Sequence, residues 1–453
     1  MSQSQAQQWS FETRQIHAGQ APDQTTGSRA LPIFQTTAFV FDSAHQAASR
    51  FALDELGPIY ARLTNPTQEV VEQRVASLEG GVGALLTASG ASAIAMALQN
   101  LAGSGDHIVA SPSLYGGTYS LLANTLPRYG ITTTFVANPT DPAAWHAAAQ
   151  PNTKAFFGEA IPNPRTDIFD IETVATVAHD HQLPLIIDNT TATPYLIRPF
   201  EWGADVVVHS ATKFLGGHGT ALGGVIVDSG RFDYAAAGAG KYPGFTEPDP
   251  AYNGLVFGQK FGPGGDFGAN LSYILKARTQ LLRDLGPAIS PFNAFLIAQG
   301  IETLSLRIER HVANALAVAQ WLEARTDVLG VNYAGLPSSP YHHLAQKYCP
   351  KGAGAVFSFE LDGGAEVGKA FVEALHLHSH VANIGDVRSL VIHPASTTHA
   401  QLSPAEQQLS AVTPGLVRLS VGLEGLGDIL ADLELGFEAA ARVRAGLASK
   451  GSE

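Results

Sequence analysis

The stretch Ala204-Asp205-Val206-Val207-Val208-His209-Ser210-Ala211-Thr212-Lys213-Phe214-Leu215-Gly216-Gly217-His218-Gly219 carries the most information about this chain. Its β-branched run predicts a buried strand that ends in a hydroxyl–x–hydroxyl–lysine sequence. A lysine just past a buried strand loses hydration, which lowers its pKa and makes it an amine nucleophile. Ser210 and Thr212 flank Lys213 and offer hydroxyls to a phosphate, and the following glycines let the backbone approach a ligand closely. The alternative is an ordinary surface lysine after a strand. Motifs elsewhere in the chain are needed to distinguish the two interpretations of Lys213.

The composition excludes several classes of protein. The chain has 453 residues, a length that predicts two or three domains. A hydrophobic fraction of 45% with 15% charged residues is typical of a globular protein. The net charge of −13 argues against nucleic acid or an anionic membrane surface as a partner, because no basic stripe is present to neutralise phosphates. No apolar run approaches the roughly 18 residues that a membrane span requires.

The N-terminal residues and the cysteine content favour a cytoplasmic protein. Residues 1–10 are polar and rich in Gln and Ser, which predicts a frayed tail rather than a signal peptide. Cys349 is the only cysteine, so no internal disulfide can form, as fits a reducing cytoplasm. No activating partner for Cys349 is evident, and we expect no catalytic role for it.

Strand-like and helix-like segments alternate from about residue 60 to residue 227. The predicted strands are Gly83–Thr87, His107–Ala110, Thr133–Ala137, Ala155–Glu159, Leu185–Asp188, Val206–His209 and Gly223–Val227. Helix-like segments between several of them are Asn65–Leu78, Ser92–Leu101 and Ile171–His181. This alternation predicts an α/β protein with a mostly parallel sheet covered on both faces.

The rest of the chain has a different pattern. Residues 230–268 are rich in Gly, Pro and aromatics and predict a long, ordered excursion. The pattern is helical over 271–324, and then come predicted strands and a last helix at Ala355–Leu361, Leu390–His393, Leu416–Val421 and Gly427–Ala445. We therefore predict three parts: an N-terminal arm (1–60), a large α/β domain (61–270) and a smaller C-terminal α+β domain (271–453).

Polar groups are expected at the carboxyl ends of the predicted strands, where ligands gather in open α/β sheets. Asp188 ends an apolar strand and can pair with a protonated pyridine nitrogen or cap a turn. The strand–turn–helix at Ala84–Ser92 offers helix N–H groups to an anion, and Gly90 allows close approach. Tyr115 can stack on an aromatic ring or lie in an ordinary turn. Each feature alone has a structural explanation.

Asn163, Ser389 and Arg418 are candidates for binding a carboxylate. Arg418 lies in the middle of a predicted buried strand, which is unusual because a buried charge needs a partner. A guanidinium matches an α-carboxylate in a bidentate geometry. An internal ion pair is the alternative explanation for Arg418.

Taken together, these residues resemble the Cys/Met-metabolism family of enzymes that depend on pyridoxal phosphate (PLP). The resemblance extends from about residue 12 to residue 441. The order and spacing of three motifs carry it: YARLTNPT at residues 60–67, DNTTATP at residues 188–194 and SATK at residues 210–213. It implies the aspartate-aminotransferase-like fold of PLP-dependent transferases. Thr191, where many relatives carry Phe, is a departure that affects packing beside the cofactor more than chemistry.

The family resemblance implies roles for the catalytic side chains. Lys213 would hold PLP covalently, Asp188 would pair with the ring nitrogen, and Tyr115 would stack on the ring. The phosphate would be held within the chain by Gly90, Ala91, Ser210 and Thr212.

The same resemblance implies roles for substrate-binding and partner residues. The substrate carboxylate would be bound by Asn163, Ser389 and Arg418. Tyr60 and Arg62 would reach the phosphate bound in a neighbouring subunit. The protein is therefore expected to be a homo-oligomer with shared active sites, a tetramer built as a dimer of dimers.

Within the family, the chain is most similar to the branch that acts on O-acetyl-L-homoserine. The excursion at Lys241–Pro250, the stretch Ser389–His399 and the total length carry this similarity. Gly117 stands where methionine γ-lyases usually carry Cys. The implied reaction is a PLP-dependent γ-replacement by sulfide or methanethiol, which gives homocysteine or methionine and acetate in methionine biosynthesis. Alternatives are a cystathionine γ-synthase or γ-lyase, an O-succinylhomoserine sulfhydrylase, and a binding scaffold with the same fold.

His376, His378 and His380 alternate, so an extended backbone would place them on one face. Such a face could bind a metal. No carboxylate or cysteine cluster completes the set, and the resemblance implies no metal there. We therefore expect no metal site.

Overall fold

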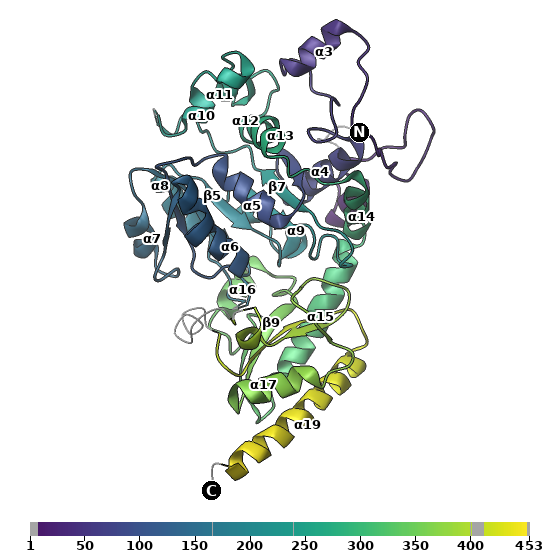
Figure 1. The fold of residues 1–453 in the computed structure, drawn as a ribbon, viewed down its shortest axis with the longest axis vertical. Helices are drawn as coiled ribbons and strands as arrows, with labels where there is room; N and C mark the ends of the chain where they lie inside the picture. Colours follow the sequence, from purple (N-terminus) through teal and green to yellow (C-terminus); the bar gives the residue numbers. More distant parts are fainter. Residues whose placement is uncertain (1–7, 165, 239, 399, 401–411, 451–453) are drawn as a thin grey trace.

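Two β-sheets organise the chain in the computed structural model, which describes residues 8–164, 166–238, 240–398, 400 and 412–450 (Figure 1). The larger sheet has seven strands in the order β1-β7-β6-β5-β4-β2-β3. Their bounds are β1 Gly83–Thr87, β2 His107–Ala110, β3 Thr132–Phe135, β4 Thr153–Glu159, β5 Leu185–Asp188, β6 Val206–Ser210 and β7 Gly224–Asp228. Residues 1–7 of the predicted tail lie outside the described residues.

The large sheet is parallel apart from β7, which runs antiparallel to both β1 and β6. Strands β1, β4, β5 and β6 therefore end at the same edge of the sheet. Each predicted strand in this part of the chain is present, with ends that agree to within two residues. The predicted mostly parallel α/β sheet is confirmed.

Seventeen α-helices of the described residues surround or connect the two sheets. Their bounds are α2 Phe11–His17, α3 Ala44–Phe51, α4 Pro66–Glu79, α5 Gly90–Gln99, α6 Gly116–Ser120, α7 Pro142–Ala148, α8 Ile171–Asp180, α9 Thr193–Leu196, α10 Pro243–Thr246, α11 Phe257–Phe261, α12 Ser272–Lys276, α13 Arg283–Leu285, α14 Pro291–Ile301, α15 Leu304–Glu323, α16 His342–Tyr348, α17 Gly364–Glu373 and α19 Leu426–Lys450. In the part of the chain that is described, no helix has the length and apolar character needed to cross a membrane.

Both faces of the large sheet are buried apart from the edge strand β3, which is only partly buried, because neighbouring residues of an inner strand belong to different cores. In β5, Leu185 and Ile187 pack in the core that contains residues of α4 and α8. Ile186 packs in the other core, with residues of α5. Burial on both faces explains why these strands are continuous apolar runs rather than alternating patterns.

The smaller sheet has five strands in the order β10-β11-β12-β9-β8. Their bounds are β8 Val328–Asn332, β9 Val356–Leu361, β10 Ser379–His380, β11 Leu390–Ile392 and β12 Leu416–Ser420. Phe371 of α17 packs against Phe359 of β9 and Phe437 of α19, with ring centroids 5.5 and 4.9 Å apart. This sheet with its helices follows the large sheet in the chain, as the sequence predicts, whereas the exact division at residues 60 and 270 stays a prediction.

Helix α15 connects the two sheets through hydrogen bonds to main-chain carbonyls. Arg307 donates to the carbonyl oxygens of Phe214 and Gly300 at 2.8 and 2.7 Å. One and two turns further along, His311 Nδ1 lies 2.7 Å from Val421 O, and Asn314 Nδ2 donates to Gly422 O at 3.0 Å. The helix therefore bonds to both the segment after β6 and the segment after β12.

Candidate active site

Lys213 lies in the turn after β6, at the sheet edge where β4 and β5 also end. Its Nζ donates a hydrogen bond to Asn383 Oδ1 at 2.5 Å. Burial, with a smaller contribution from the Arg418 charge, lowers the pKa of Lys213. The amine is therefore a better nucleophile and base than an exposed lysine.

Asp188 ends β5 and is buried beside Glu159, which is its register partner at the end of β4. The backbone N–H and hydroxyl of Thr190 donate to Asp188 Oδ1 at 2.9 and 2.5 Å. Burial raises the pKa of Asp188, and the Thr190 hydrogen bonds and His209 oppose that shift. Among the described residues no hydrogen bond reaches Asp188 Oδ2, so this oxygen can accept a ring N–H.

The N-terminus of α5 lies against the end of β6. Ser89 caps the helix by accepting from Ser92 N at 3.2 Å, which leaves the N–H groups of Gly90 and Ala91 in the first turn for an anion. A Cβ added at Gly90 would lie 2.6 Å from Ser210 Cβ and 2.8 Å from Ser210 Cα. Only glycine allows this approach, which places the helix N–H groups next to the Ser210 side chain.

Thr212, the other hydroxyl of the predicted phosphate site, is engaged within the chain. Its Oγ1 donates to Gly223 O at 3.2 Å and accepts from Gly223 N at 3.1 Å. This pair of hydrogen bonds fixes the turn that carries Lys213. A phosphate needs a hydrogen-bond donor, but the Thr212 O–H is already donated to Gly223 O and only an acceptor lone pair of its oxygen remains. The predicted contact of Thr212 with phosphate therefore requires the hydroxyl to turn away from Gly223.

Tyr115 precedes α6, and the residue is 56% exposed. Its main-chain N–H donates to Glu159 Oε1 at 2.7 Å, which ties Tyr115 to the end of β4. Tyr115 is also close enough to Arg418 to oppose, by electrostatics, the lowering of the Arg418 pKa by burial. An exposed ring fixed through its backbone is suited to cover a flat ligand.

Arg418 comes from β12 of the smaller sheet and is buried. Its Nη1 donates to Asn163 Oδ1 at 3.2 Å, and its Nη2 donates to Asn383 O at 2.9 Å. The third group, Nε, is buried without a hydrogen-bond partner, and burial lowers the pKa of Arg418 to about 10. No carboxylate of the described residues forms an ion pair with Arg418, so the alternative of an internal ion pair does not apply.

Ser389 does not join Arg418 and Asn163. Its hydroxyl donates to Glu424 Oε2 at 2.9 Å and accepts from Gly422 N at 2.9 Å. Its own N–H donates to Glu424 Oε1 at 2.7 Å. The Ser389 side chain therefore supports the loop after β12, and its predicted contact with a substrate carboxylate requires these bonds to rearrange.

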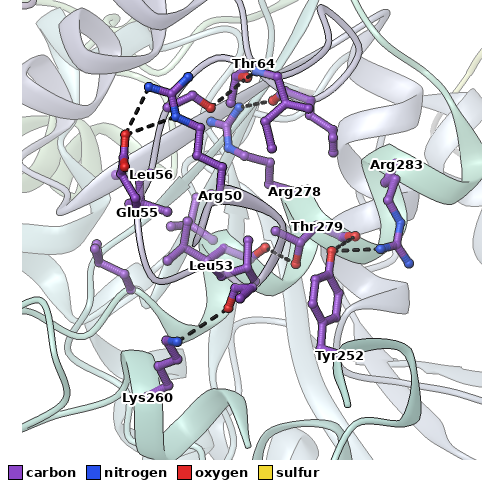
Figure 2. Close-up of a pocket in the computed structure, with 18 of the residues that line it drawn as sticks. Arg50, Leu53, Glu55, Leu56, Thr64, Tyr252, Lys260, Arg278, Thr279 and Arg283 are labelled. Carbon is purple, nitrogen blue, oxygen red and sulfur yellow. Dashed lines mark hydrogen bonds and ion pairs between the residues drawn. The ribbon is translucent and has the colours of Figure 1, made fainter. Parts of the chain in front are cut away.

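Tyr60 ends the N-terminal arm and Arg62 lies just beyond it; both side chains are exposed, and the Arg62 guanidinium is 5.2 Å from the Tyr60 ring centroid. No recorded hydrogen bond or ion pair joins either side chain to the Gly90–Ser210–Lys213 region of the same chain. The arm, the excursion, α4 and the segment around Arg278 line a separate cavity of about 1080 Å³ (Figure 2). Residues that line it include Arg50, Leu53, Glu55, Tyr252, Lys260 and Arg278.

Two site residues were not predicted. Glu159 ends a predicted strand, so the rule that functional groups follow strand ends would have identified it. Asn383 lies between β10 and β11, and its side chain and carbonyl contact Lys213 and Arg418. No local pattern marks Asn383, because its neighbours are brought to it from two different sheets.

The sequence analysis expects no metal site at His376, His378 and His380 and no catalytic role for Cys349, and these residues lie away from Lys213. His378 Nδ1 lies 2.7 Å from Asp432 Oδ2, whereas His380 is exposed in β10. In the described ranges no group of three or more His, Cys, Asp or Glu side chains is placed to hold a metal. Cys349 is buried, and burial raises the pKa of its thiol to about 12.

The residues at the sheet edge fit PLP. Asp188 has an oxygen available for the ring nitrogen, and the close approach at Gly90 forms a small cradle for a phosphate. Lys213 supplies an amine with a lowered pKa, and the buried Arg418 Nε has no partner among the described residues and is left for a further acceptor. These are the donors and acceptors that such a cofactor and an amino-acid substrate require.

The sequence matches the family described as Cys/Met metabolism PLP-dependent enzymes over residues 12–438, and the chain belongs to this family. It is 55% identical over 438 residues to an O-acetyl-L-homoserine sulfhydrylase of Corynebacterium glutamicum, which covers 96% of this chain and 98% of that protein. It is 50% identical over 431 residues to a homocysteine synthase of Schizosaccharomyces pombe, with coverages of 95% and 98%.

Solved structures agree with this family. A crystal structure described as an O-acetylhomoserine (thiol)-lyase from Campylobacter jejuni has a TM-score of 0.90 and 41% identity, covers 95% of this chain and 100% of its own, and contains a pyridoxyl-lysine phosphate. A cystathionine γ-lyase from Lactobacillus plantarum has a TM-score of 0.80 and 32% identity, with coverages of 96% and 100%. The predicted family, fold and dependence on PLP are confirmed.

Proposed function

We propose that this protein catalyses the replacement of the acetyl group of O-acetyl-L-homoserine by sulfide, giving L-homocysteine and acetate. The observation that carries the proposal is the chain of contacts from Arg418 through Asn383 to Lys213. A substrate carboxylate bound by Arg418 would hold the α-carbon next to the Lys213 amine. The relatives named as O-acetyl-L-homoserine sulfhydrylases and homocysteine synthase supply the identity of the substrate and product.

PLP, when bound, supplies an electron sink next to the substrate α-carbon. Arg418 binds and orients the α-carboxylate. When it is not bound to the cofactor, Lys213 would take the proton from Cα, pass it on to the cofactor, and so be neutral again to take one from Cβ; its lowered pKa favours the neutral amine. Asp188 holds the proton on the ring nitrogen. Acetate leaves from Cγ with the C–O bonding electrons, sulfide forms the new C–S bond there, and Lys213 returns the protons.

The enzyme is accordingly a transferase of methionine biosynthesis. The charges of the site residues favour the acetyl ester of homoserine, whose acyl group is neutral, over the succinyl ester. Arg418 and Lys213 are the cations among the described site residues, and both act at the α-carbon end of the substrate, away from the acyl group. Arg388 is exposed and paired with Asp386 at 2.9 Å. A succinyl ester would bring a second carboxylate that this set leaves unpaired, so the acetyl ester fits better than the succinyl ester.

The active site is completed by a second copy of the chain. Tyr60 and Arg62 offer a phenol and a guanidinium to a phosphate, and both are exposed and apart from their own chain's Lys213. Large apolar side chains of the same arm are exposed, namely Ile33, Val40, Phe51 and Leu56. A homotetramer built as a dimer of dimers would cover them and bring each arm to the adjacent phosphate site.

A cytoplasmic location suits the chemistry of the chain. Its single cysteine, Cys349, is buried and free, so the protein has no disulfide to maintain. Reduced thiols are the rule in that compartment.

A substrate panel tests the reaction. O-acetylhomoserine, O-succinylhomoserine, O-acetylserine, cystathionine and methionine are each tested with sulfide, with methanethiol and with neither, and thiol product and 2-oxobutanoate are measured. We expect the highest kcat/KM for O-acetylhomoserine with sulfide and little 2-oxobutanoate. A preference for cystathionine or for the succinyl ester would overturn the proposal.

Two variants test the site and its sharing. Lys213→Ala should lose both turnover and the visible absorbance of bound PLP. Mixing it with Arg62→Ala under conditions of subunit exchange should restore part of the activity, because one site of a mixed dimer carries both defects and the other carries neither. Exchange without restored activity would show that Arg62 serves its own chain.

A further inference from the structure

Glu159 is a buried carboxyl group at the centre of the site that the mechanism above does not use. It ends β4 in register with Asp188 at the end of β5, and the two residues are 6% and 7% exposed. Its Oε1 accepts the N–H of Tyr115 at 2.7 Å, and the N–H of Asn163 also bonds to its carboxyl group. Glu159 therefore contacts the segments that carry the proposed ring-stacking and carboxylate-binding residues.

The surroundings of the two carboxyl groups differ. Asp188 receives two hydrogen bonds from Thr190, and His209 of β6 lies close enough to favour its ionised form. His209 itself pairs with the fully buried Glu79 at 2.6 Å. Glu159 receives only main-chain N–H groups, from the segment before α6 and from the loop after β4, and no cation of the described residues pairs with it.

Two neighbouring buried carboxyl groups cannot both ionise without a large electrostatic cost. Burial and the neighbouring Asp188 raise the pKa of Glu159 well above its usual range. The proton of the pair therefore belongs on Glu159, and the negative charge on Asp188, which faces the ring nitrogen in the proposed site.

We propose that Glu159 is a positioning residue that acts as a neutral carboxylic acid, holding Tyr115 and Asn163 in place and leaving Asp188 as the only anion at the ring nitrogen. This inference rests on the proposed cofactor site. The Glu159 carboxyl group accepts the two main-chain N–H groups, so the residue acts through its neighbours rather than on the substrate.

The test compares Glu159→Gln with Glu159→Ala in the complete enzyme. Glutamine has the shape and neutral charge of the protonated acid and keeps a carbonyl acceptor, whereas alanine removes the acceptor and leaves two N–H groups without it. The readouts are the dissociation constant of PLP from the apo-enzyme, the pH at which the visible absorbance of the bound cofactor changes, and KM and kcat for O-acetylhomoserine.

We expect Glu159→Gln to keep the PLP affinity, the pH of the absorbance change and kcat close to those of the parent enzyme. Glu159→Ala should weaken PLP binding about tenfold or more, because buried N–H groups lose their acceptor, and should raise KM through Asn163. If Glu159→Gln moves the absorbance change or binds PLP as poorly as Glu159→Ala, Glu159 acts as an anion and the proposal is wrong. Parent-like behaviour of Glu159→Ala would equally overturn it.

Glu360→Gln is the matched control, because Glu360 is a strand glutamate of the smaller sheet that accepts Gly415 N at 3.2 Å. It should leave the PLP affinity and the absorbance unchanged. Lys213→Ala separates this inference from the proposed function: retention of the visible absorbance in that variant would refute the cofactor site itself. If Lys213→Ala loses the visible absorbance while Glu159→Gln changes the PLP affinity or the pH of the absorbance change, only the role of Glu159 is refuted.

Discussion

Replacing Gly90 with alanine tests the assignment of the phosphate site by adding one methyl group. The added Cβ would lie 2.6 Å from Ser210 Cβ, 2.8 Å from Ser210 Cα and 3.0 Å from Ser210 Oγ. Rotation of the Ser210 side chain cannot relieve the contact with Cα, so the first turn of α5 has to move away from β6. That movement separates the N–H groups of Gly90 and Ala91 from the Ser210 hydroxyl.

The expected magnitude follows from these contacts. Overpacking at a tight site costs about 1–3 kcal/mol of the free energy of unfolding. The preference of alanine for a helix, up to about 1 kcal/mol in a helix interior, offsets part of this cost. Loss of one hydrogen bond to the charged phosphate costs about 1.5–3 kcal/mol, which corresponds to PLP binding weakened about 10- to 150-fold.

The assay is a titration of apo-enzyme with PLP, followed by absorbance, together with the thermal unfolding midpoint of the apo-enzyme. Gly427→Ala is the control, since Gly427 lies in the first turn of α19 and an added Cβ there meets no atom within 4 Å. The control should bind PLP normally and unfold at the same or a higher temperature. If Gly90→Ala binds PLP with parent affinity and has an unchanged midpoint, the α5 N-terminus is not the phosphate site.

Three further substitutions have distinct expected outcomes. Arg418→Ala should lower kcat/KM for O-acetylhomoserine by an amount equivalent to about 2–4 kcal/mol, mainly through KM, and steady-state kinetics with an unchanged kcat/KM would contradict carboxylate binding by Arg418. Asn383→Ala removes the acceptor of Lys213 Nζ but keeps the main-chain carbonyl that Arg418 uses, so kcat should fall about tenfold with a smaller change in KM. A raised KM with an unchanged kcat would contradict the role of Asn383 in positioning Lys213. Burial raises the pKa of Asp228 from 3.8 to about 7, so its contribution to stability is complete below the usual pKa and is lost as the pH rises through about 7. Denaturant unfolding from acidic to neutral pH should therefore show Asp228→Asn gaining stability over the parent, by up to about 4 kcal/mol at and above pH 7, and a constant difference across the range would refute this explanation.

The inner strands of the large sheet could be predicted because their burial on two faces produces continuous apolar runs, whereas the edge strand β3 is marked by its β-branched threonines. Strand β8 could not, since it is an edge strand in which Leu329 is 66% exposed and Gly330 interrupts the pattern. Helix α3 was also missed, although Ser43 caps it by accepting Gln46 N at 3.1 Å. A serine followed by a short helix-forming run gives only a weak signal.

The residues of the candidate site also differ in whether local sequence could predict them. Lys213 and Asp188 follow strands of one parallel sheet, and the topology brings such ends together. Asn383 depends on the packing of the second sheet against the first, which no local pattern reports. Ser389 fits the family pattern, yet its hydroxyl bonds to Glu424, because a partner 35 residues further along the chain competes for it.

The hydrogen bonds of α15 bear on which substitutions the enzyme can accumulate. Arg307, His311 and Asn314 all bond to carbonyl oxygens, at Phe214, Val421 and Gly422 among others. A carbonyl is common to all twenty amino acids, so these three side chains recognise the path of the backbone and not the residues along it. These bonds therefore require no particular side chain at the contacted residues, although an added Cβ at Gly422 would lie 2.5 Å from Ser389 N. Loss of an α15 side chain, in contrast, removes a bond to the lysine-bearing turn or to the segment after the arginine-bearing strand. Libraries that aim to alter the preferred thiol should leave the three α15 residues fixed, together with Lys213 beside Phe214 and the tightly packed Gly422.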